Sequence, residues 1–151
     1  MRVYEAKLTY EATLFEVGAK SLSTAENVYD YMKDTLEVHP MQEVFHVVLL
    51  NQKNKPLGRV AITSGTVSGT LIHPREVFRP AIVAGASAIV CTHNHPSGDP
   101  TPSAADVSAT RKLREASRIV DIELLDHVIL GRRECDPSGV GYYSFRSAGL
   151  I

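Results

Sequence analysis

The sequence has few cysteines, almost no net charge and no long hydrophobic run. Cys91 and Cys135 are too few for a disulfide scaffold. The 16 basic and 17 acidic residues leave a net charge of −1, which gives no electrostatic support for a nucleic-acid partner. Apolar runs such as VVLL at 47–50 are far shorter than the ~20 residues that span a bilayer. Because no segment is typical of a signal peptide either, we expect a soluble, cytoplasmic, reduced protein without membrane contact.

Periodicity and turn signals predict alternating strands and helices. The first part of the chain is expected to hold a strand from residue 2 that ends near Gly18, and then a helix with Ser23 and Glu26 as its capping box and Pro40 as its stop. Residues 43–63 are expected to form two strands joined by the polar turn NQKNKP. The first of these strands is apolar on both faces, which places it in the middle of a sheet.

The second half of the sequence continues this pattern. Pro74 is expected to begin a helix that Pro80 kinks or shortens. A buried strand (87–91), a helix (103–119), a strand (120–130) and a final strand (141–147) follow. No internal repeat or linker divides the chain. The order β, α, β, β, α, β, α, β, β predicts a mixed α/β fold, in which helices flank a central mixed sheet.

Two histidines stand where the buried strand leads into the next helix. His93 and His95 are two residues apart at the end of an extended segment, so their side chains project to the same face. Asp106 lies in the first turn of the following helix, from which its carboxylate can reach back toward the strand end. Two imidazoles and one carboxylate are the ligand set that leaves a tetrahedral zinc ion with an open position for water. The spacing therefore favours a catalytic metal site.

The same residues also allow a purely structural interpretation. Ser103 and Asp106 have the spacing of a capping pair, which needs no metal. The proline-rich loop at 96–102 could be no more than a stiff connection. However, two histidines that face the same way at a strand end have no such general explanation.

Several known motifs are absent. The consecutive letters HNH are not the dispersed residues that give HNH nucleases their name. A zinc deaminase needs H-x-E followed by P-C-x-x-C, whereas residue 95 is histidine and the sequence contains no C-x-x-C. There is also no H-E-x-x-H helix.

The pattern H-x-H, seven residues, Ser, two residues, Asp is similar to the JAMM motif of the JAB/MPN metalloprotease superfamily. The stretch HNHPSGDPTPSAAD, the upstream HPREVF and the downstream LDH resemble its RadC-like branch. This resemblance covers residues 41–151. It implies an MPN/JAB (cytidine-deaminase-like) architecture, with residues 41–151 as the metal-binding core and residues 1–40 as an N-terminal strand and helix. We expect the two parts to form a single domain.

The resemblance also implies a role for each site residue. It implies Zn²⁺ held by His93, His95 and Asp106, with Ser103 near the reacting oxygen and Glu43 as the general base. On sequence alone, Glu37 or Glu76 could also be argued as the base. The implied reaction is zinc-dependent hydrolysis of a peptide or isopeptide bond in a protein or peptide substrate.

Two other functions stay open from the sequence. One is a nucleic-acid-associated, DNA-repair type of protein, although longer RadC-like proteins carry an N-terminal helix-hairpin-helix region and only about forty residues precede the core here. The other is a non-catalytic MPN interaction module.

Four further features of the sequence lie outside the predicted ligand set. His73 and His127 could line the cleft or hold a metal ligand through a hydrogen bond. Cys91 is expected to be a core residue, and the Ser/Gly/Thr segment at 63–70 is a candidate flap.

Overall fold

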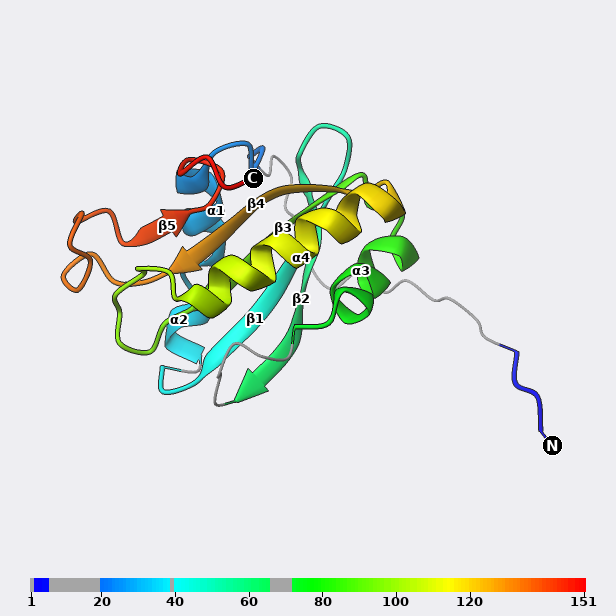
Figure 1. Ribbon diagram of the computed structural model, residues 1–151, viewed down its shortest axis with the longest axis horizontal. Helices are drawn as coiled ribbons and strands as arrows, with labels where there is room; N and C mark the ends of the chain where they lie inside the picture. Colours follow the sequence, from blue (N-terminus) through cyan, green and yellow to red (C-terminus); the bar gives the residue numbers. More distant parts are fainter. Residues whose placement is uncertain (1, 6–19, 39, 66–71) are drawn as a thin grey trace.

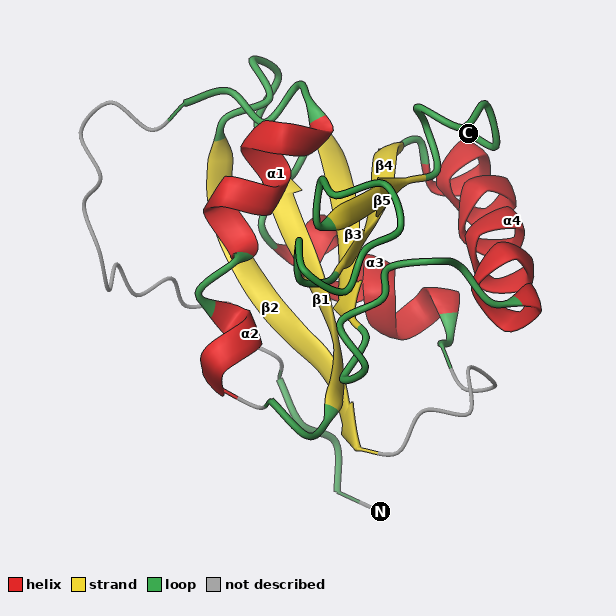
Figure 2. Cartoon of the chain, turned by 90° about the vertical axis from the view of Figure 1, so that its left-hand side faces the viewer, coloured by secondary structure: helices red, strands yellow, loops and turns green. Residues whose placement is uncertain are grey.

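A five-stranded mixed sheet with helices on both faces forms the centre of the molecule (Figures 1 and 2). The computed structural model describes residues 2–5, 20–38, 40–65 and 72–151. The helices are α1 (Ala25–Met32), α2 (Thr35–Val38), α3 (Pro74–Val83) and α4 (Ala104–Val120). The strands are β1 (Glu43–Leu50), β2 (Pro56–Gly65), β3 (Ala88–Asn94), β4 (Glu123–Leu130) and β5 (Tyr142–Ser144).

The strand order is β2-β1-β3-β4-β5. β1 pairs antiparallel with both β2 and β3, which confirms its predicted central position. β3 and β4 are parallel and are connected through α4, whereas β4 and β5 are antiparallel. The mixed α/β class predicted from the sequence is therefore confirmed.

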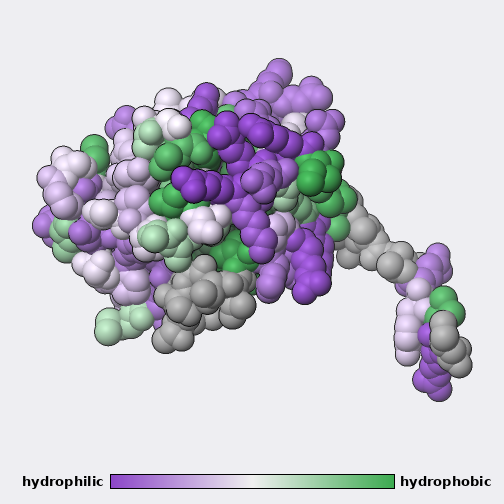
Figure 3. All heavy atoms as spheres, viewed as in Figure 1, coloured by the Kyte–Doolittle hydropathy of each residue, from purple (hydrophilic) through white to green (hydrophobic). Residues whose placement is uncertain are grey.

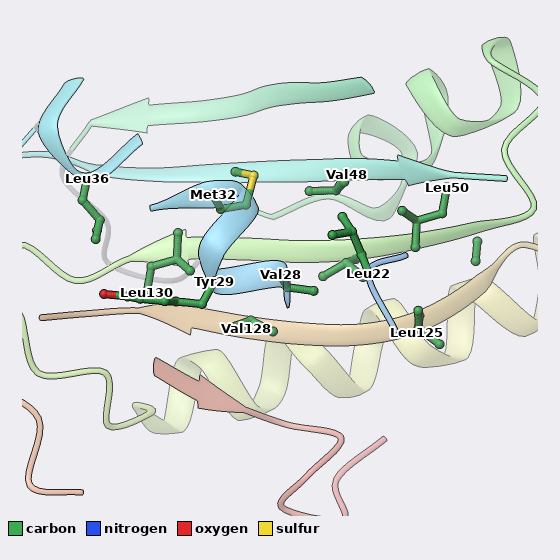
Figure 4. Close-up of a cluster of buried hydrophobic side chains, with 12 residues drawn as sticks. Leu22, Val28, Tyr29, Met32, Leu36, Val48, Leu50, Leu125, Val128 and Leu130 are labelled. Atoms are coloured by element: carbon green, nitrogen blue, oxygen red, sulfur yellow. The ribbon is translucent and has the colours of Figure 1, made fainter. Parts of the chain in front are cut away.

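Alternating strand residues divide the core between the two faces of the sheet. Val48 and Leu50 face α1, where they pack in a cluster with Val28 and Met32 (Figure 4). The alternate residues of β1, Phe45, Val47 and Leu49, pack instead with Val77 and Phe78 of α3 and Leu113 of α4. The face that α4 covers is the one to which His93 points, because His93 has the same strand parity as Ile89 and Cys91 in that cluster.

The first helix differs from the prediction in its cap and its length. Thr24, not Ser23, is the N-cap, and its hydroxyl accepts a hydrogen bond from Asn27 N at 3.2 Å. The predicted single helix up to Pro40 is also divided, because α1 ends at Met32 and α2 begins at Thr35. The Thr35 hydroxyl donates to Met32 O at 2.6 Å, which satisfies a carbonyl at the end of α1.

Pro80 does not shorten α3, which continues to Val83. A proline removes one backbone hydrogen bond from a helix. Here the residues around it, Val77, Phe78 and Ala81, are buried against the sheet, and this packing keeps the turn helical.

The predicted first strand is not tested by the structure as a whole. Residues 2–5 form no strand, and the remainder of that prediction lies outside the described residues. Of the proposed flap, residues 63–65 end β2 and the rest also lies outside them.

The outward face of α4 is charged. Arg111, Lys112 and Glu115 are exposed, and the face seen in Figure 3 is dominated by hydrophilic residues with smaller apolar patches. None of the helices in the described parts of the chain has the length and apolarity needed to cross a bilayer.

Candidate metal centre

Three elements bring the candidate ligands together at one end of the sheet. β3 ends at Asn94, so His93 belongs to the strand and His95 to the loop after it. β1 runs antiparallel to β3 with Phe45 opposite His93, which carries Glu43, the first residue of β1, to the level of His95. α4 begins beside this strand end and supplies Asp106 from its first turn.

The four side chains converge within a small, largely buried volume. One potential ligand atom from each of Glu43, His93, His95 and Asp106 lies within 4.8 Å of the other three. Nε2 of His93 is 3.2 Å from Nε2 of His95 and 3.2 Å from Oδ1 of Asp106. Glu43 Oε1 is 3.7 Å from Nε2 of His93. The exposed fractions of the side chains range from 3% for His93 to 16% for His95, so solvent solvates these polar atoms poorly.

Hydrogen bonds to the far side of each imidazole orient its Nε2 toward the cluster. Nδ1 of His95 lies 2.8 Å from the carbonyl oxygen of Asp99, which can only accept a hydrogen bond. A neutral His95 therefore carries its proton on Nδ1 and presents a lone pair on Nε2. Nδ1 of His93 lies 2.8 Å from Nε2 of His127, and this hydrogen bond fixes the orientation of the His93 ring.

At the N-terminus of α4, Ser103 and Asp106 form a cap, and Asp106 also belongs to the group of four candidate ligands. Ser103 Oγ accepts from Asp106 N at 3.1 Å, and Asp106 Oδ2 accepts from Ser103 N at 2.7 Å, which is a complete capping box. Asp106 Oδ1 meanwhile faces His93. The capping and metal interpretations of these two residues are therefore compatible, because the cap uses only Oδ2 and leaves Oδ1 to the cluster.

Comparison with known proteins places this chain in a family. The model of the RadC-like JAB domain matches residues 22–150. The chain belongs to the RadC-like JAB domain family. A UPF0758 protein of Symbiobacterium thermophilum is 44% identical over 124 residues, which cover 82% of this chain and 50% of that protein. A UPF0758 protein of Thermotoga maritima is 42% identical over 132 residues, which cover 87% and 55%. This RadC-like chain thus spans about half the length of the curated relatives it matches.

Burial and the neighbouring charges shift the acid–base properties of this RadC-like site. Burial raises the pKa of Glu43, and the histidines beside it only partly offset this effect. Burial would also raise the pKa of Asp106, but the imidazoles of His93 and His95 beside its carboxylate outweigh burial and hold that pKa far below its usual range. The two carboxyl groups therefore differ in basicity, and Glu43 is the one that takes up a proton more readily.

Asn94 connects the two strands that carry the site. Its Oδ1 accepts from Val44 N at 2.8 Å, and its Nδ2 donates to Gln42 O at 2.8 Å. These two backbone groups flank Glu43 on either side. The asparagine between the two histidines consequently fixes the backbone from which Glu43 projects.

The remaining residues singled out in the sequence have different positions. His73 is exposed and is the N-cap of α3, without a side-chain capping bond. Cys91 is buried in the cluster beneath α3 and α4, outside the group of four, and burial raises the pKa of its thiol. Neither Glu37 nor Glu76 belongs to the group of four.

Sequence reasoning missed the roles of Asn94 and of Thr110, whose hydroxyl contacts both Asp106 O and His127. For Thr110, the sequence offered one signal: it follows Asp106 by four residues on the same helix, which is the spacing at which a threonine hydroxyl can donate to a backbone carbonyl.

Proposed function

We propose that this RadC-like protein is a zinc-dependent hydrolase that cleaves a peptide or isopeptide bond. The observation that carries the proposal is the convergence of two imidazole nitrogens and two carboxylates in one buried cluster. Four hydrogen-bond acceptors at such short separations repel one another unless a cation or protons lie between them. The arrangement is therefore suited to hold a cation.

The donor set fits zinc better than a hard cation. Magnesium and calcium prefer oxygen ligands, whereas two neutral imidazoles with carboxylate are typical of zinc. His93, His95 and Asp106 would hold the ion, since their donor atoms lie closest together. When bound, zinc supplies a Lewis acid and lowers the pKa of a coordinated water from about 15.7 to about 7.

Glu43 is suited to the role of general base. Its pKa is raised by burial, and its Oε1 lies 3.7 Å from Nε2 of His93, farther than Oδ1 of Asp106 at 3.2 Å. Oε1 of Glu43 would accept a proton from the attacking water and deliver it to the nitrogen of the departing amine. Asn94 supports this function by holding the backbone on both sides of Glu43.

Ser103 is suited to stabilise the negative charge that develops on the substrate oxygen. In the capping box its Oγ uses a lone pair to accept from Asp106 N. The hydroxyl proton is not needed for the cap and can be donated to the substrate. One such donor contributes roughly 3–4 kcal/mol of transition-state stabilisation.

The proposed substrate is a protein or a peptide. A nucleic-acid substrate has less support, because the net charge of −1 provides no general attraction for phosphates.

The test combines metal analysis with activity measurements. Purified protein is expected to hold about one zinc per chain and to lose it in His93→Ala and in Asp106→Asn. Glu43→Gln is expected to keep the zinc but to lose at least about 100-fold in hydrolysis of a peptide and isopeptide library. Zinc content unchanged in both ligand variants would exclude the site. Full activity in Glu43→Gln would exclude Glu43 as the base, and bound zinc without any hydrolysis would favour an interaction module.

A further inference from the structure

We propose that Thr110 and His127 are positioning residues that fix the tautomer of His93, so that its Nε2 presents a lone pair to the metal. This inference rests on the proposed metal site. It concerns two residues that are not themselves in the group of four. His127 lies on β4 and Thr110 on α4, and both side chains are buried.

A continuous chain of hydrogen bonds joins these residues to two of the ligands. Thr110 Oγ1 is 2.8 Å from the carbonyl oxygen of Asp106 and 2.6 Å from Nδ1 of His127. Nε2 of His127 is 2.8 Å from Nδ1 of His93. The chain of hydrogen bonds therefore runs from the backbone carbonyl of Asp106 to Nδ1 of His93.

Counting protons along this chain gives its direction. A carbonyl oxygen cannot donate, so the single proton of the Thr110 hydroxyl is used on Asp106 O. Thr110 Oγ1 must then accept from Nδ1–H of His127. A neutral His127 has no second proton, so its Nε2 accepts from Nδ1–H of His93. Nε2 of His93 is left with a lone pair, which is the form that binds a metal.

The opposite direction leaves one contact unsatisfied. If Thr110 donated to His127, the proton of His93 would move to Nε2, and Thr110 Oγ1 would face Asp106 O with two lone pairs opposed at 2.8 Å. Such a buried, unpaired contact costs roughly 1–3 kcal/mol. The Asp106 carbonyl thus favours the tautomer of His93 that carries its proton on Nδ1. The Asp106 carboxylate, with Oδ1 3.2 Å from Nε2 of His93, favours the opposite tautomer until a cation lies between them.

The surroundings of His127 keep its ring in this orientation. It is 1% exposed and stacks on Phe145 with 4.8 Å between ring centroids. The ring of Phe45 is tilted against the His127 ring, with 5.6 Å between their centroids. Phe45 also stacks on His93, with 6.1 Å between the ring centroids. The two imidazoles are therefore held between aromatic rings, and reorientation would disturb the core beneath α4.

The closest test is a pair of substitutions at Thr110. Thr110→Val keeps the shape but removes the hydroxyl, whereas Thr110→Ser keeps the hydroxyl. We expect Thr110→Val to weaken zinc affinity about 10- to 100-fold, measured by competition with a chromophoric chelator. Thr110→Ser should bind zinc within a few-fold of the unsubstituted protein. Ser108→Ala, at an exposed position of the same helix, is the control.

A spectroscopic measurement reports the tautomer itself. The measurement uses the zinc-free Asp106→Ala variant, which lacks the carboxylate 3.2 Å from Nε2 of His93 but keeps the backbone carbonyl at residue 106. At mildly alkaline pH, its imidazole ¹⁵N chemical shifts should show His93 protonated on Nδ1 and unprotonated on Nε2. When Thr110→Val is added, the proton should move toward Nε2. His93 protonated on Nε2 in the Asp106→Ala variant would overturn the inference, as would equal zinc affinity of Thr110→Val and Thr110→Ser.

Substitutions at His127 give an independent comparison if Thr110→Val does not fold. His127→Gln keeps an acceptor toward Nδ1 of His93 and should retain most of the zinc affinity, whereas His127→Leu should lose it. Equal affinities would again contradict the inference. Failure of the proposed hydrolase would be seen differently, as a lack of zinc or of hydrolysis in the unsubstituted protein. The tautomer of His93 can be read without either.

Discussion

The side-chain amide of Asn94 replaces backbone hydrogen bonds between β1 and β3 at the end of the sheet. β1 and β3 are paired through their backbones up to Phe45 and His93. Beyond that pair, Asn94 supplies both an acceptor and a donor to the neighbouring strand. It is 6% exposed, so water cannot replace these bonds at low cost. The middle letter of the HNH triplet therefore has a structural role of its own.

Replacing Asn94 should destabilise the fold. Asn94→Leu removes the acceptor of Val44 N and the donor to Gln42 O. We expect the free energy of unfolding, measured by urea denaturation, to fall by about 2–3 kcal/mol. Gln42→Ala is the control, because the Gln42 side chain is exposed and its carbonyl is unchanged; its effect should stay within about 0.5 kcal/mol. Equal effects of the two substitutions would show that the two hydrogen bonds of the Asn94 side chain contribute nothing to stability.

At the scale of elements, the first turn of α4 combines a stability function with the proposed chemistry, and the two can be separated. At an N-cap, alanine costs about 1 kcal/mol, whereas glycine costs only a few tenths. Ser103→Ala should therefore lower the free energy of unfolding by about 1 kcal/mol, and Ser103→Gly should leave it nearly unchanged. Both variants lack the hydroxyl, so both should lose activity to a similar extent. Activity that follows stability, and is retained in Ser103→Gly, would show that Ser103 acts only as a cap.

Besides Asp106 on α4, Asp126 on β4 is also a buried carboxylate, and it connects β4 to the C-terminal segment through hydrogen bonds. It accepts hydrogen bonds from the Ser144 hydroxyl at 2.6 Å and from Arg146 N at 3.0 Å. Burial nevertheless raises its pKa above the ordinary value of 3.8. The folded state therefore binds this proton more strongly than the unfolded state does. The resulting stability is fully present below about pH 3.8 and is lost as the pH rises through the raised value.

The prediction for Asp126 follows from that sign. Asp126→Asn cannot ionise and keeps one of the two acceptor oxygens, the one that can accept from Arg146 N. The decline in stability just above pH 3.8 should therefore become smaller in urea titrations at a series of pH values. Asp126→Ala should instead lose about 2–4 kcal/mol throughout, because the hydrogen bonds disappear. An unchanged pH dependence in Asp126→Asn would mean that the ionised carboxylate is not disfavoured by burial.

For the whole molecule, local sequence patterns predict elements better than they predict the contacts between them. The central position of β1 follows from its apolar residues on both faces, and α4 follows from its spacing and cap. The end of α1 at Met32 was not predictable, because it depends on a local bond from Thr35 that competes with a continuous helix. The link from His93 through His127 to Thr110 joins three elements, and no spacing in the sequence indicates that β4 lies beside β3 in this register.

Because the four side chains of the candidate centre come from β1, from the end of β3 with its following loop and from α4, a bound cation should stabilise the whole fold. Zinc at about 100 times its dissociation constant should add about 2.7 kcal/mol to the free energy of unfolding, which raises Tm by about 5–10 °C. The shift should vanish in His93→Ala and persist in His73→Ala, whose exposed imidazole lies outside the group of four. Magnesium should give no comparable shift, since it binds imidazole poorly. An equal rise in Tm for both histidine variants would mean that zinc stabilises the protein from some other place on its surface.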